Sequence, residues 1–404
     1  MIFHFVVDEK VTDQVIENFD ITDENVFVIF CSKGTEEFRH IRRSGDNVLY
    51  FDYQVDDINA LVSLYKPEAV ILHGLQHVFA VTILKLKKEL TIGWYVWGFD
   101  IYGLPKIKPY IYAPLTSNLL SRLDKGRAVK VLLKQNKFIR SFYSRFIDKS
   151  PDYVSTKIQA LKRISYCISY IKEDYDLFSQ HYPNKLTFVH CALSSLDQYL
   201  ANKVSQVLSK NAGNILIGNS NSFESNHLDV FDILNHNDCK ALISNSKIYV
   251  PLSYGGNETY TEEVVTKGKS LFDNQFQPLL SFIDREEYVK ILKTCAVGIF
   301  YHFRQQGMGN LIAMLYLGSR IYMSHKNPAY HFFVKNKVLV FELETDFKVY
   351  GCSQLSIEDR EHNRLRLEDI FSKNKVATDV ENLYKVLKRS KNEVSISERR
   401  ENLI

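Results

Sequence analysis

The sequence has few of the features that mark disulfide-linked, metal-binding or membrane-spanning proteins. Its six cysteines are scattered along 404 residues without a C-x-x-C pair, which argues against a disulfide framework or a zinc ribbon. There is no run of about 18 apolar residues, so we expect no membrane span. The apolar start, Ile2–Val7, lacks a basic leader and is predicted to be a first strand, not a signal peptide. A net charge of only +4 gives the whole chain no attraction to nucleic acid.

Several common catalytic motifs are also missing. The sequence contains no G-x-x-x-x-G-K-[ST] and no full G-x-G-x-x-G, which weakens an ATPase or dehydrogenase interpretation. It contains no G-x-S-x-G nucleophile elbow. No group of histidine, cysteine and carboxylate residues has the spacing of metal ligands, so we expect no metal and no cofactor.

An alternation of short apolar runs and amphipathic segments is present instead. With 45% hydrophobic and 24% charged residues the chain is typical of globular proteins, and its length predicts two domains. The alternation predicts α/β domains with parallel, helix-covered sheets: residues 1–195, residues 196–387, and a charged, disordered tail at 388–404. The strands are expected at 2–7, 26–30, 47–51, 69–73, 92–97, 166–171, 187–190, 214–217, 247–251, 277–282, 296–301, 320–323 and 338–342.

Residues 299–328 are the most informative stretch. A strand ending at Tyr301 runs into R-Q-Q-G-M-G-N at 304–310, and a helix follows. The first N–H groups of a helix have no intrahelical partner and carry partial positive charge, so this turn predicts an anion site. Gly307 and Gly309 allow a phosphate to approach the backbone, and Arg304 adds a planar cation. A simple strand–helix turn with a glycine cap is the alternative.

Two more loops of the second half follow predicted strands. G-N-S-N-S at 218–222 suits either a helix cap or a diphosphate. In Y-G-G-N-E-T-Y at 254–260, Tyr254 is a candidate to stack on a base and Glu258 to bind a ribose or sugar hydroxyl. Three such loops on strands of one sheet favour a ligand site, because parallel strands bring their carboxyl ends to the same edge.

The first half has its own candidates at strand ends. His73 ends one apolar run, and Asp100 follows the next run among aromatic residues. Desolvation there would raise the pKa of Asp100 and make it a general base for an acceptor. Asp8, after the first strand, is the second candidate. Either carboxylate could instead cap a helix.

Residues 119–149 are rich in basic residues with interleaved apolar ones. The cations are Arg122, Lys125, Arg127, Lys130, Lys134, Lys137, Arg140, Arg145 and Lys149, against Asp124 and Asp148. Such a stretch suits an anionic membrane surface or a pyrophosphate-linked lipid, or it forms a solvated pair of helices.

These stretches resemble a known family, the bacterial TDP-N-acetylfucosamine:lipid II N-acetylfucosaminyltransferases of glycosyltransferase family 56, which act in enterobacterial common antigen synthesis. The similar segments occur in family order between about residues 70 and 330. They are H-G at 73–74, W-G-F-D-I-Y at 97–102, I-G-N-S at 217–220, V-P at 250–251, N-E-T-Y-T-E-E-V at 257–264, R-Q-Q-G-M-G at 304–309 and N-P at 327–328.

The resemblance implies a GT-B fold of two Rossmann-like domains, with the nucleotide-sugar in the C-terminal domain and the acceptor facing the N-terminal one. It also implies metal-independent transfer of a deoxyamino sugar such as Fuc4NAc, from a TDP-sugar to a polyprenyl-diphosphate-linked glycan. The enzyme would be cytoplasmic and peripheral at the inner membrane, with the nucleotide-sugar as a substrate and not a cofactor. Another GT-B transferase with a different donor or a non-lipid acceptor, a non-catalytic nucleotide-sugar-binding module and a GT-B-fold epimerase are the alternatives.

The candidate residues then fall into three groups. We expect Arg304, Asp100 and Asp8 to be catalytic. We expect His73, Trp97 and Tyr102 to lie on the acceptor side. The expected donor-binding residues are Gly218, Asn219, Ser220, Tyr254, Glu258, Tyr260, Gln305, Gln306, Gly307, Gly309, Asn310 and Asn327.

Overall fold

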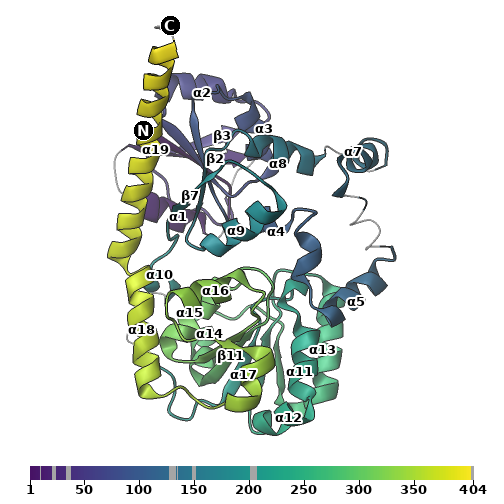
Figure 1. The fold of residues 1–404 in the computed structure, drawn as a ribbon. Helices are drawn as coiled ribbons and strands as arrows, with labels where there is room; N and C mark the ends of the chain where they lie inside the picture. Colours follow the sequence, from purple (N-terminus) through teal and green to yellow (C-terminus); the bar gives the residue numbers. More distant parts are fainter. Residues whose placement is uncertain are drawn as a thin grey trace. The chain divides into compact units, whose positions relative to one another are not determined.

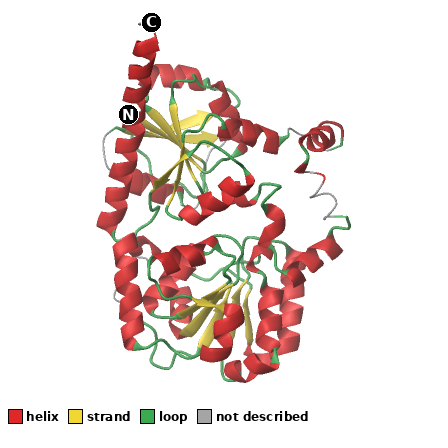
Figure 2. Ribbon diagram, in the orientation of Figure 1, coloured by secondary structure: helices red, strands yellow, loops and turns green. Residues whose placement is uncertain are grey.

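The computed structural model of the chain contains two α/β units (Figures 1 and 2). Unit 1 comprises residues 1–106, 133–194 and 373–404, and unit 2 comprises residues 107–132 and 195–372. The structure describes residues 1–9, 11–20, 24–32, 38–126, 133, 135–147, 152–200 and 207–401. Among the helices in these ranges, none is long and apolar enough to cross a membrane.

Unit 1 is built on a seven-stranded sheet in the order β3-β2-β1-β4-β5-β6-β7, and every neighbouring pair is parallel. The strands are β1 (Ile2–Val6), β2 (Asn25–Cys31), β3 (Val48–Asp52), β4 (Ala69–His73), β5 (Thr91–Tyr95), β6 (Tyr166–Ser169) and β7 (Thr187–His190). The helices are α1 (Thr12–Phe19), α2 (Ile58–Tyr65), α3 (His77–Lys85), α4 (Phe99–Tyr102), α7 (Lys137–Phe146), α8 (Tyr153–Leu161), α9 (Lys172–His181) and α19 (Lys373–Glu401).

Unit 2 carries a six-stranded parallel sheet in the order β10-β9-β8-β11-β12-β13. Its strands are β8 (Asn214–Ile217), β9 (Ile248–Pro251), β10 (Phe276–Leu279), β11 (Cys295–Phe300), β12 (Arg320–Met323) and β13 (Phe341–Glu342). Its α-helices are α5 (Pro114–Leu123), α10 (Leu196–Tyr199), α11 (His227–Asn235), α12 (Asn237–Lys240), α13 (Glu258–Phe272), α14 (Arg285–Thr294), α15 (Met308–Leu317), α16 (Pro328–Lys335), α17 (Leu343–Tyr350) and α18 (Ile357–Phe371). Short 3-10 helices are η1 (Lys108–Ile111), η2 (Phe223–Ser225), η3 (Ala241–Ile243) and η4 (Asp273–Gln275).

The predicted mixed α/β architecture with two parallel sheets is confirmed, and the observed strands lie on the predicted apolar runs. The strands could be located because those covered on both faces are almost wholly apolar, as the buried β1, β4 and β11 show. β4 and β8 are followed directly by Gly74 and Gly218, which open the next turn.

Residues 107–132 belong to unit 2 and not, as predicted, to the N-terminal domain. Three hydrogen bonds within unit 2 explain the difference. The backbone N–H of Ala113 donates to Asn226 Oδ1 at 2.9 Å. Asp229, near the start of α11, accepts the backbone N–H groups of Leu115 at 2.7 Å and Thr116 at 3.0 Å. A carboxylate and an amide from a distant part of the chain therefore cap the start of α5.

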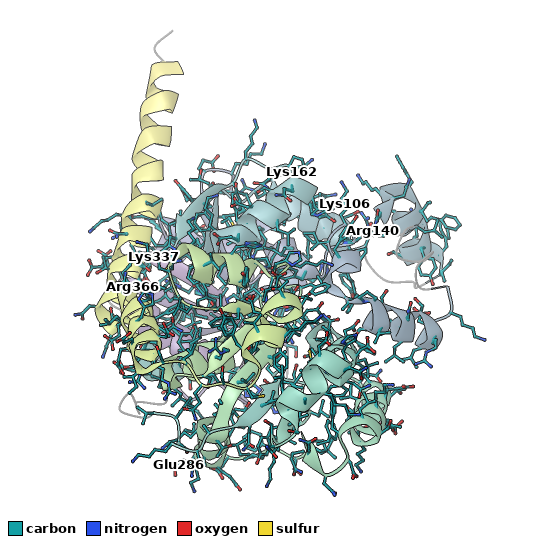
Figure 3. All side chains as sticks on the ribbon, turned by 60° about the horizontal axis from the view of Figure 1, so that its bottom comes forward. Lys106, Arg140, Lys162, Glu286, Lys337 and Arg366 are labelled. Atoms are coloured by element: carbon teal, nitrogen blue, oxygen red, sulfur yellow. The ribbon has the colours of Figure 1, made fainter. Side chains whose placement is uncertain are left out.

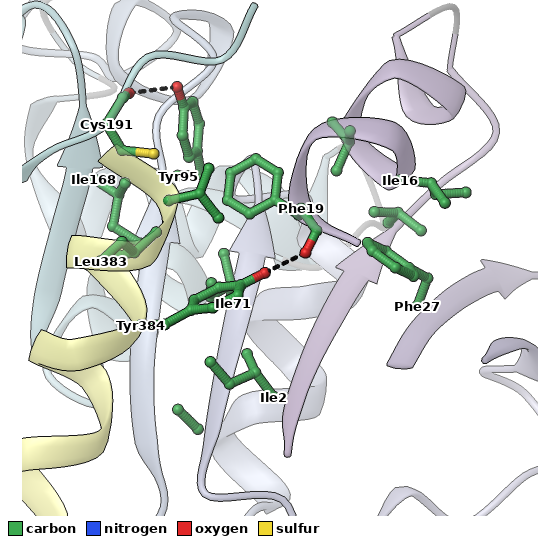
Figure 4. Close-up of a cluster of buried hydrophobic side chains, with 14 of the residues drawn as sticks. Ile2, Ile16, Phe19, Phe27, Ile71, Tyr95, Ile168, Cys191, Leu383 and Tyr384 are labelled. Atoms are coloured by element: carbon green, nitrogen blue, oxygen red, sulfur yellow. Dashed lines mark hydrogen bonds between the residues drawn. The ribbon is translucent and has the colours of Figure 1, made fainter. Parts of the chain in front are cut away.

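The C-terminal end of the chain is helical, which differs from the prediction of a disordered tail. Helix α19 belongs to unit 1, and Val380, Leu383, Tyr384 and Leu387 join its buried core (Figure 4). The hydroxyl of Tyr384 donates to the carbonyl of Phe19 at 2.6 Å. The helix continues through Glu401, so residues 388–401 are helical where a disordered tail is predicted. Residues 402–404 lie outside the described ranges.

Candidate functional site

Three polar loops meet at the carboxyl edge of the unit 2 sheet. They follow β9, β8 and β11, which are adjacent and parallel in the sheet order. The loop after β8 covers residues 218–222, the loop after β9 covers 252–257, and the loop after β11 covers 301–307. The sequence predicts these three loops as one site, and the topology brings them to one edge.

Gln306 links the loop after β11 to the loop after β8. Its side-chain Nε2 lies 2.8 Å from Ser222 Oγ, 3.2 Å from Asn219 Oδ1 and 3.4 Å from Ser220 Oγ. Asn219 and Ser220 are both buried. The amide of Gln306 thus holds three small polar side chains of the loop after β8.

The loop after β9 is bonded in turn to the loop after β8. Asn221 donates its backbone N–H to the carbonyl of Tyr254 at 3.0 Å, and Asn219 Nδ2 donates to the Tyr254 hydroxyl at 3.4 Å. A Cβ atom at Gly256 would lie only 2.1 Å from the Asn221 carbonyl oxygen, so glycine is required for this approach. Tyr254 remains 49% exposed, which leaves its ring able to stack on a ligand.

Helix α15 begins directly after the third loop, without a side-chain cap. Its N-cap residue, Gly307, is left-handed with φ of 68°, and a Cβ atom there would lie 3.0 Å from Asn219 Cγ. The first intrahelical bond runs from Leu311 N to Gly307 O at 3.0 Å. A Cβ atom at Gly309 would meet nothing within 4 Å, so the first turn opens to space. This start of α15 has the donors and the partial positive charge that an anion needs.

Arg304 and Asn310 flank that first turn in the sequence. Arg304 is half-buried in the loop before α15, and its Nε donates to the Gln305 carbonyl at 3.4 Å. Asn310 donates from Nδ2 to the hydroxyl of Tyr288 at 2.9 Å. The loop therefore combines a permanent cation with a helix start, as the sequence predicts. Gln305 is half-buried in the same loop.

Two buried histidines belong to or contact these loops, and sequence reasoning missed both: His302 lies in the loop after β11, and a Cβ atom at Gly218 would lie 2.8 Å from His227 Nε2. His227 begins α11 and His302 follows β11; both are fully buried. Burial lowers the pKa of each to about 3, so both rings are neutral at pH 7. Among the described residues, neither ring nitrogen of His302 has a hydrogen-bond partner. Nε2 of His227 has none there either. The only sequence signal is a histidine inside an apolar strand end, Y-H-F at 301–303.

Two residues expected to touch the donor have structural contacts instead. Tyr260 is fully buried, and its hydroxyl accepts the backbone N–H of His227 at 3.2 Å. Asn327 is fully buried and caps α16 by accepting the backbone N–H of Ala329 at 2.9 Å. Tyr260 thus contacts the start of α11 and Asn327 the start of α16, and a contact of either residue with the donor stays a prediction. Glu258, the first residue of α13, is exposed and remains a candidate for contact with the donor.

The carboxylates expected to act in unit 1 are occupied by the protein's own donors. Asp100 is 1% exposed and accepts Trp94 Nε1 at 2.7 Å, Leu75 N at 3.0 Å and Trp97 N at 3.2 Å. Burial raises its pKa, as predicted, although these hydrogen bonds and Lys157 oppose the shift. The Asp100 carboxylate therefore links the loops after β4 and β5. Its burial leaves neither oxygen exposed to an acceptor substrate.

Asp8 is engaged in a similar manner. It accepts the backbone N–H groups of Arg39, His40 and Ile41 at 2.7, 2.9 and 3.0 Å. Burial would raise the pKa of Asp8, but the three amides lower it below its ordinary value. Its geometry therefore favours holding residues 39–41 over accepting a proton.

The three acceptor-side residues differ in their surroundings. His73 is buried and its Nε2 lies 3.0 Å from Nδ1 of His4, which is also buried. Tyr102 is buried and donates its hydroxyl to Asp174. Trp97 is half-buried, and its Nε1 has no hydrogen-bond partner among the described residues. The same is true of Nδ1 of His73. Trp97 is thus the acceptor-side candidate whose side chain is least enclosed.

Part of the basic stretch lies outside the described residues, including Arg127, Lys130, Lys134, Asp148 and Lys149. In the remainder, Arg122 pairs with Glu263 at 3.6 Å and Arg140 with Asp152 at 2.9 Å. A search of the described ranges for three or more histidine, cysteine or carboxylate residues that could together hold a metal ion finds no such group.

Comparison with known proteins gives one family and one fold. The family model described as 4-alpha-L-fucosyltransferase, glycosyl transferase group 56, matches residues 153–363, more than half of the chain. Among solved structures, an alpha,alpha-trehalose-phosphate synthase (UDP-forming) from Burkholderia vietnamiensis has a TM-score of 0.59 at 9% identity, covering 98% of each chain.

Two further structures cover 96% of this chain. A trehalose-6-phosphate structure from E. coli bound with UDP-2-fluoro glucose has a TM-score of 0.58 at 10% identity and 98% of its own chain covered. Sucrose-phosphate synthase from Thermosynechococcus elongatus has a TM-score of 0.58 at 9% identity and 99% of its own chain covered. These likenesses identify the fold as GT-B, which confirms the predicted fold class.

Proposed function

The chain belongs to the glycosyl transferase group 56 family, described as 4-alpha-L-fucosyltransferase, and from this premise we propose both its donor and its acceptor. The donor is a nucleotide-diphosphate deoxyamino sugar, with TDP-Fuc4NAc favoured. The acceptor is a polyprenyl-diphosphate-linked glycan of cell-surface polysaccharide synthesis. The R-Q-Q-G-M-G and N-E-T-Y-T-E-E-V segments support this choice within the glycosyltransferases, because they resemble the family that uses these substrates.

One observation carries the donor side of the proposal. The uncapped start of α15 faces open space at Gly309, beside loops that Gln306 holds together. A departing nucleoside diphosphate gains negative charge as the glycosidic bond breaks. Helix N–H groups and the Arg304 guanidinium already in place stabilise that charge more in the transition state than in the ground state. We therefore assign the diphosphate to Arg304 and the first turn of α15.

The other proposed donor contacts come from the loops after β8 and β9 and from the start of α13. Asn219 and Ser220 would contact the phosphates or the sugar, and Tyr254 would stack on the base. Glu258, exposed at the start of α13, would accept hydrogen bonds from ribose or sugar hydroxyls. In the similar E. coli structure the bound molecule is UDP-2-fluoro glucose, which is itself a nucleotide-sugar.

Charge stabilisation by a helix start and an arginine needs no metal ion. We propose metal-independent transfer on this ground, with activity in excess EDTA equal to activity with magnesium. We also propose that the enzyme works at the cytoplasmic face of the inner membrane, attached peripherally, since a polyprenyl-linked acceptor remains in the bilayer.

The test is a direct transfer assay with matched donors. The protein is incubated with a polyprenyl-diphosphate-linked disaccharide and TDP-Fuc4NAc, and in parallel with TDP-glucose, UDP-N-acetylglucosamine and GDP-fucose. We expect release of TDP and an acceptor mass increase of one acetamido-dideoxyhexose from the first donor alone, with or without EDTA. Transfer from only a UDP- or GDP-sugar would contradict the donor assignment. A strict need for a divalent ion would contradict the metal-independent mechanism.

A further inference from the structure

Helix α7 of unit 1 is amphipathic, but it exposes its apolar face and buries part of its polar face. Its exposed residues include Phe138, Phe142 and Phe146, which are 83%, 60% and 61% exposed. Their spacing of four residues places the three rings on one face of the helix. Phe142 and Phe146 contact each other with ring centroids 4.8 Å apart. Ile139 and Ile147 extend the exposed apolar surface, at 40% and 57% exposed.

The polar side of α7 is the side that unit 1 buries. Arg140 is only 7% exposed, and its Nε lies 2.9 Å from Asp152 Oδ1 and its Nη2 lies 3.0 Å from Ser155 Oγ. Ser141 adds a hydrogen bond to Asp152 Oδ2 at 3.1 Å. Figure 1 shows α7 standing out from the body of unit 1 near α8, and Figure 3 labels Arg140 on its inner side. A surface helix normally buries its apolar face, so this arrangement prepares the aromatic face for an apolar partner.

The charge around the aromatic face identifies that partner. Lys137 and Arg145 are exposed beside the phenylalanine row, and the described part of the helix contains no acidic residue. Phenylalanines flanked by lysine and arginine match the boundary between acyl chains and anionic headgroups, where apolar burial and charge attraction add. A second copy of the chain fits less well. A face about 15 Å long and about 10 Å wide falls well short of the roughly 800 Å² per partner of a stable interface.

We propose that α7 is the membrane-binding element of this protein, inserting Phe138, Phe142 and Phe146 into the interface of an anionic bilayer. This inference rests on the proposed peripheral attachment and names the segment and the surface that make it. Arg140 is the anchor: its pairing with Asp152 transmits the position of the helix to α8 and the rest of unit 1.

The test uses vesicles that contain neither donor nor acceptor, so it is independent of glycosyl transfer. The wild type should co-sediment with vesicles of phosphatidylcholine and phosphatidylglycerol, and less at high salt. The variant F138S/F142S/F146S should partition at least about 100-fold more weakly, because three apolar side chains leave the interface. K137E/R145E should lose roughly tenfold or more on anionic vesicles and little on pure phosphatidylcholine.

A matched control removes three equally exposed apolar side chains elsewhere. Val55, Leu64 and Phe282 are 68%, 75% and 85% exposed, and V55S/L64S/F282S should bind as the wild type does. If the F138S/F142S/F146S variant also binds as the wild type does, α7 is not the element, although the peripheral attachment stands. If the wild type does not bind anionic vesicles, attachment and inference both fail. Wild-type dimers that this variant converts to monomers, without vesicle binding, would show that a second copy covers the face.

Variants with one added tryptophan keep the test valid if the triple variant fails to fold. The fluorescence that F142W adds to that of the native Trp94 and Trp97 should be quenched by lipids brominated near the top of the acyl chain, and the fluorescence that F282W adds should not. Equal quenching of the two variants would overturn the proposal.

Discussion

In unit 2, the loops at the carboxyl edge of the sheet hold one another through amide and hydroxyl side chains and leave the first turn of α15 uncapped. In unit 1, the loops at the corresponding edge are held by carboxylates, and Asp8 and Asp100 each accept three donors from their own chain. Both sheets are parallel and offer the same strand-end position. The difference is that the unit 1 carboxylates are each bonded to three donors of the protein, whereas the start of α15 in unit 2 has no side-chain cap.

That difference separates ligand binding from loop positioning. Helix N–H groups without partners gain hydrogen bonds when an anion arrives, whereas a carboxylate with three donors must lose bonds before it can act as a base. We therefore expect substitutions at the unit 2 edge to change transfer, and substitutions of the unit 1 carboxylates to change stability.

The largest effect is expected at Arg304. Arg304→Ala should lower kcat by roughly 100- to 1000-fold, the scale of losing one preorganised donor to a developing charge. Arg304→Lys should recover only part, because an ammonium cannot make a bidentate contact. Steady-state kinetics with saturating acceptor measure this effect. Arg122→Ala, which removes an exposed partner of Glu263 in the same unit, is the matched control and should keep its turnover.

A smaller effect is expected at the two glycines of the α15 start. Gly307→Ala should weaken donor binding by about tenfold, because its φ of 68° strains alanine and its Cβ displaces Asn219. Gly309→Ala should leave the melting temperature unchanged or slightly higher, since alanine favours helices and the space is open. Its added methyl group should nevertheless weaken donor binding several-fold. Donor titrations and thermal unfolding of both variants measure these effects. If Gly309→Ala binds the donor as tightly as the wild type does, the assignment of the donor to this helix start is wrong.

For Asp100 the expected change is in stability. Asp100→Asn replaces one acceptor oxygen by a donor facing the backbone of Trp97, so the free energy of unfolding should fall by about 1–3 kcal/mol. Turnover of the folded variant should stay within about threefold of wild type. Asp176→Asn, at an exposed pair with Lys172, should change stability by well under 1 kcal/mol. A loss of kcat on the order of 100-fold at normal stability would restore Asp100 as a general base.

The last effect concerns the pH dependence of stability. The pKa of His302 is lowered to about 3 in the folded protein, so between pH 6.5 and about 3 the unfolded chain binds a proton that the folded one does not. The contribution of neutral His302 to the free energy of unfolding is therefore fully present above pH 6.5. It declines as the pH falls, with a limiting slope of about 1.4 kcal/mol per pH unit for each such histidine. Urea unfolding at pH 7.5 and 5.0 should show a smaller decline for His302→Asn than for wild type. Equal declines would contradict neutral burial of His302.

The sequence predicted the strands and the three loops of unit 2 because those features are local. An apolar run followed by glycine and polar residues identifies a strand end, and parallel order brings such ends together. It did not predict that residues 107–132 belong to unit 2, because Asp229 and Asn226 cap α5 from more than 100 positions away. Nor could it show that Tyr260 is buried against His227, or that Leu75 and Trp94 occupy Asp100, since these contacts exist only in the folded sheet.

The central claim is that the uncapped α15 start and Arg304 bind the diphosphate of the donor. Calorimetric titration of TDP and TMP into the wild type and Arg304→Ala, in EDTA, tests it most directly. We predict that the wild type binds TDP more tightly than TMP, and that Arg304→Ala loses at least about tenfold in TDP affinity while TMP affinity changes little. If Arg304→Ala binds TDP as tightly as the wild type does, the diphosphate site is elsewhere and the account of the unit 2 edge is wrong.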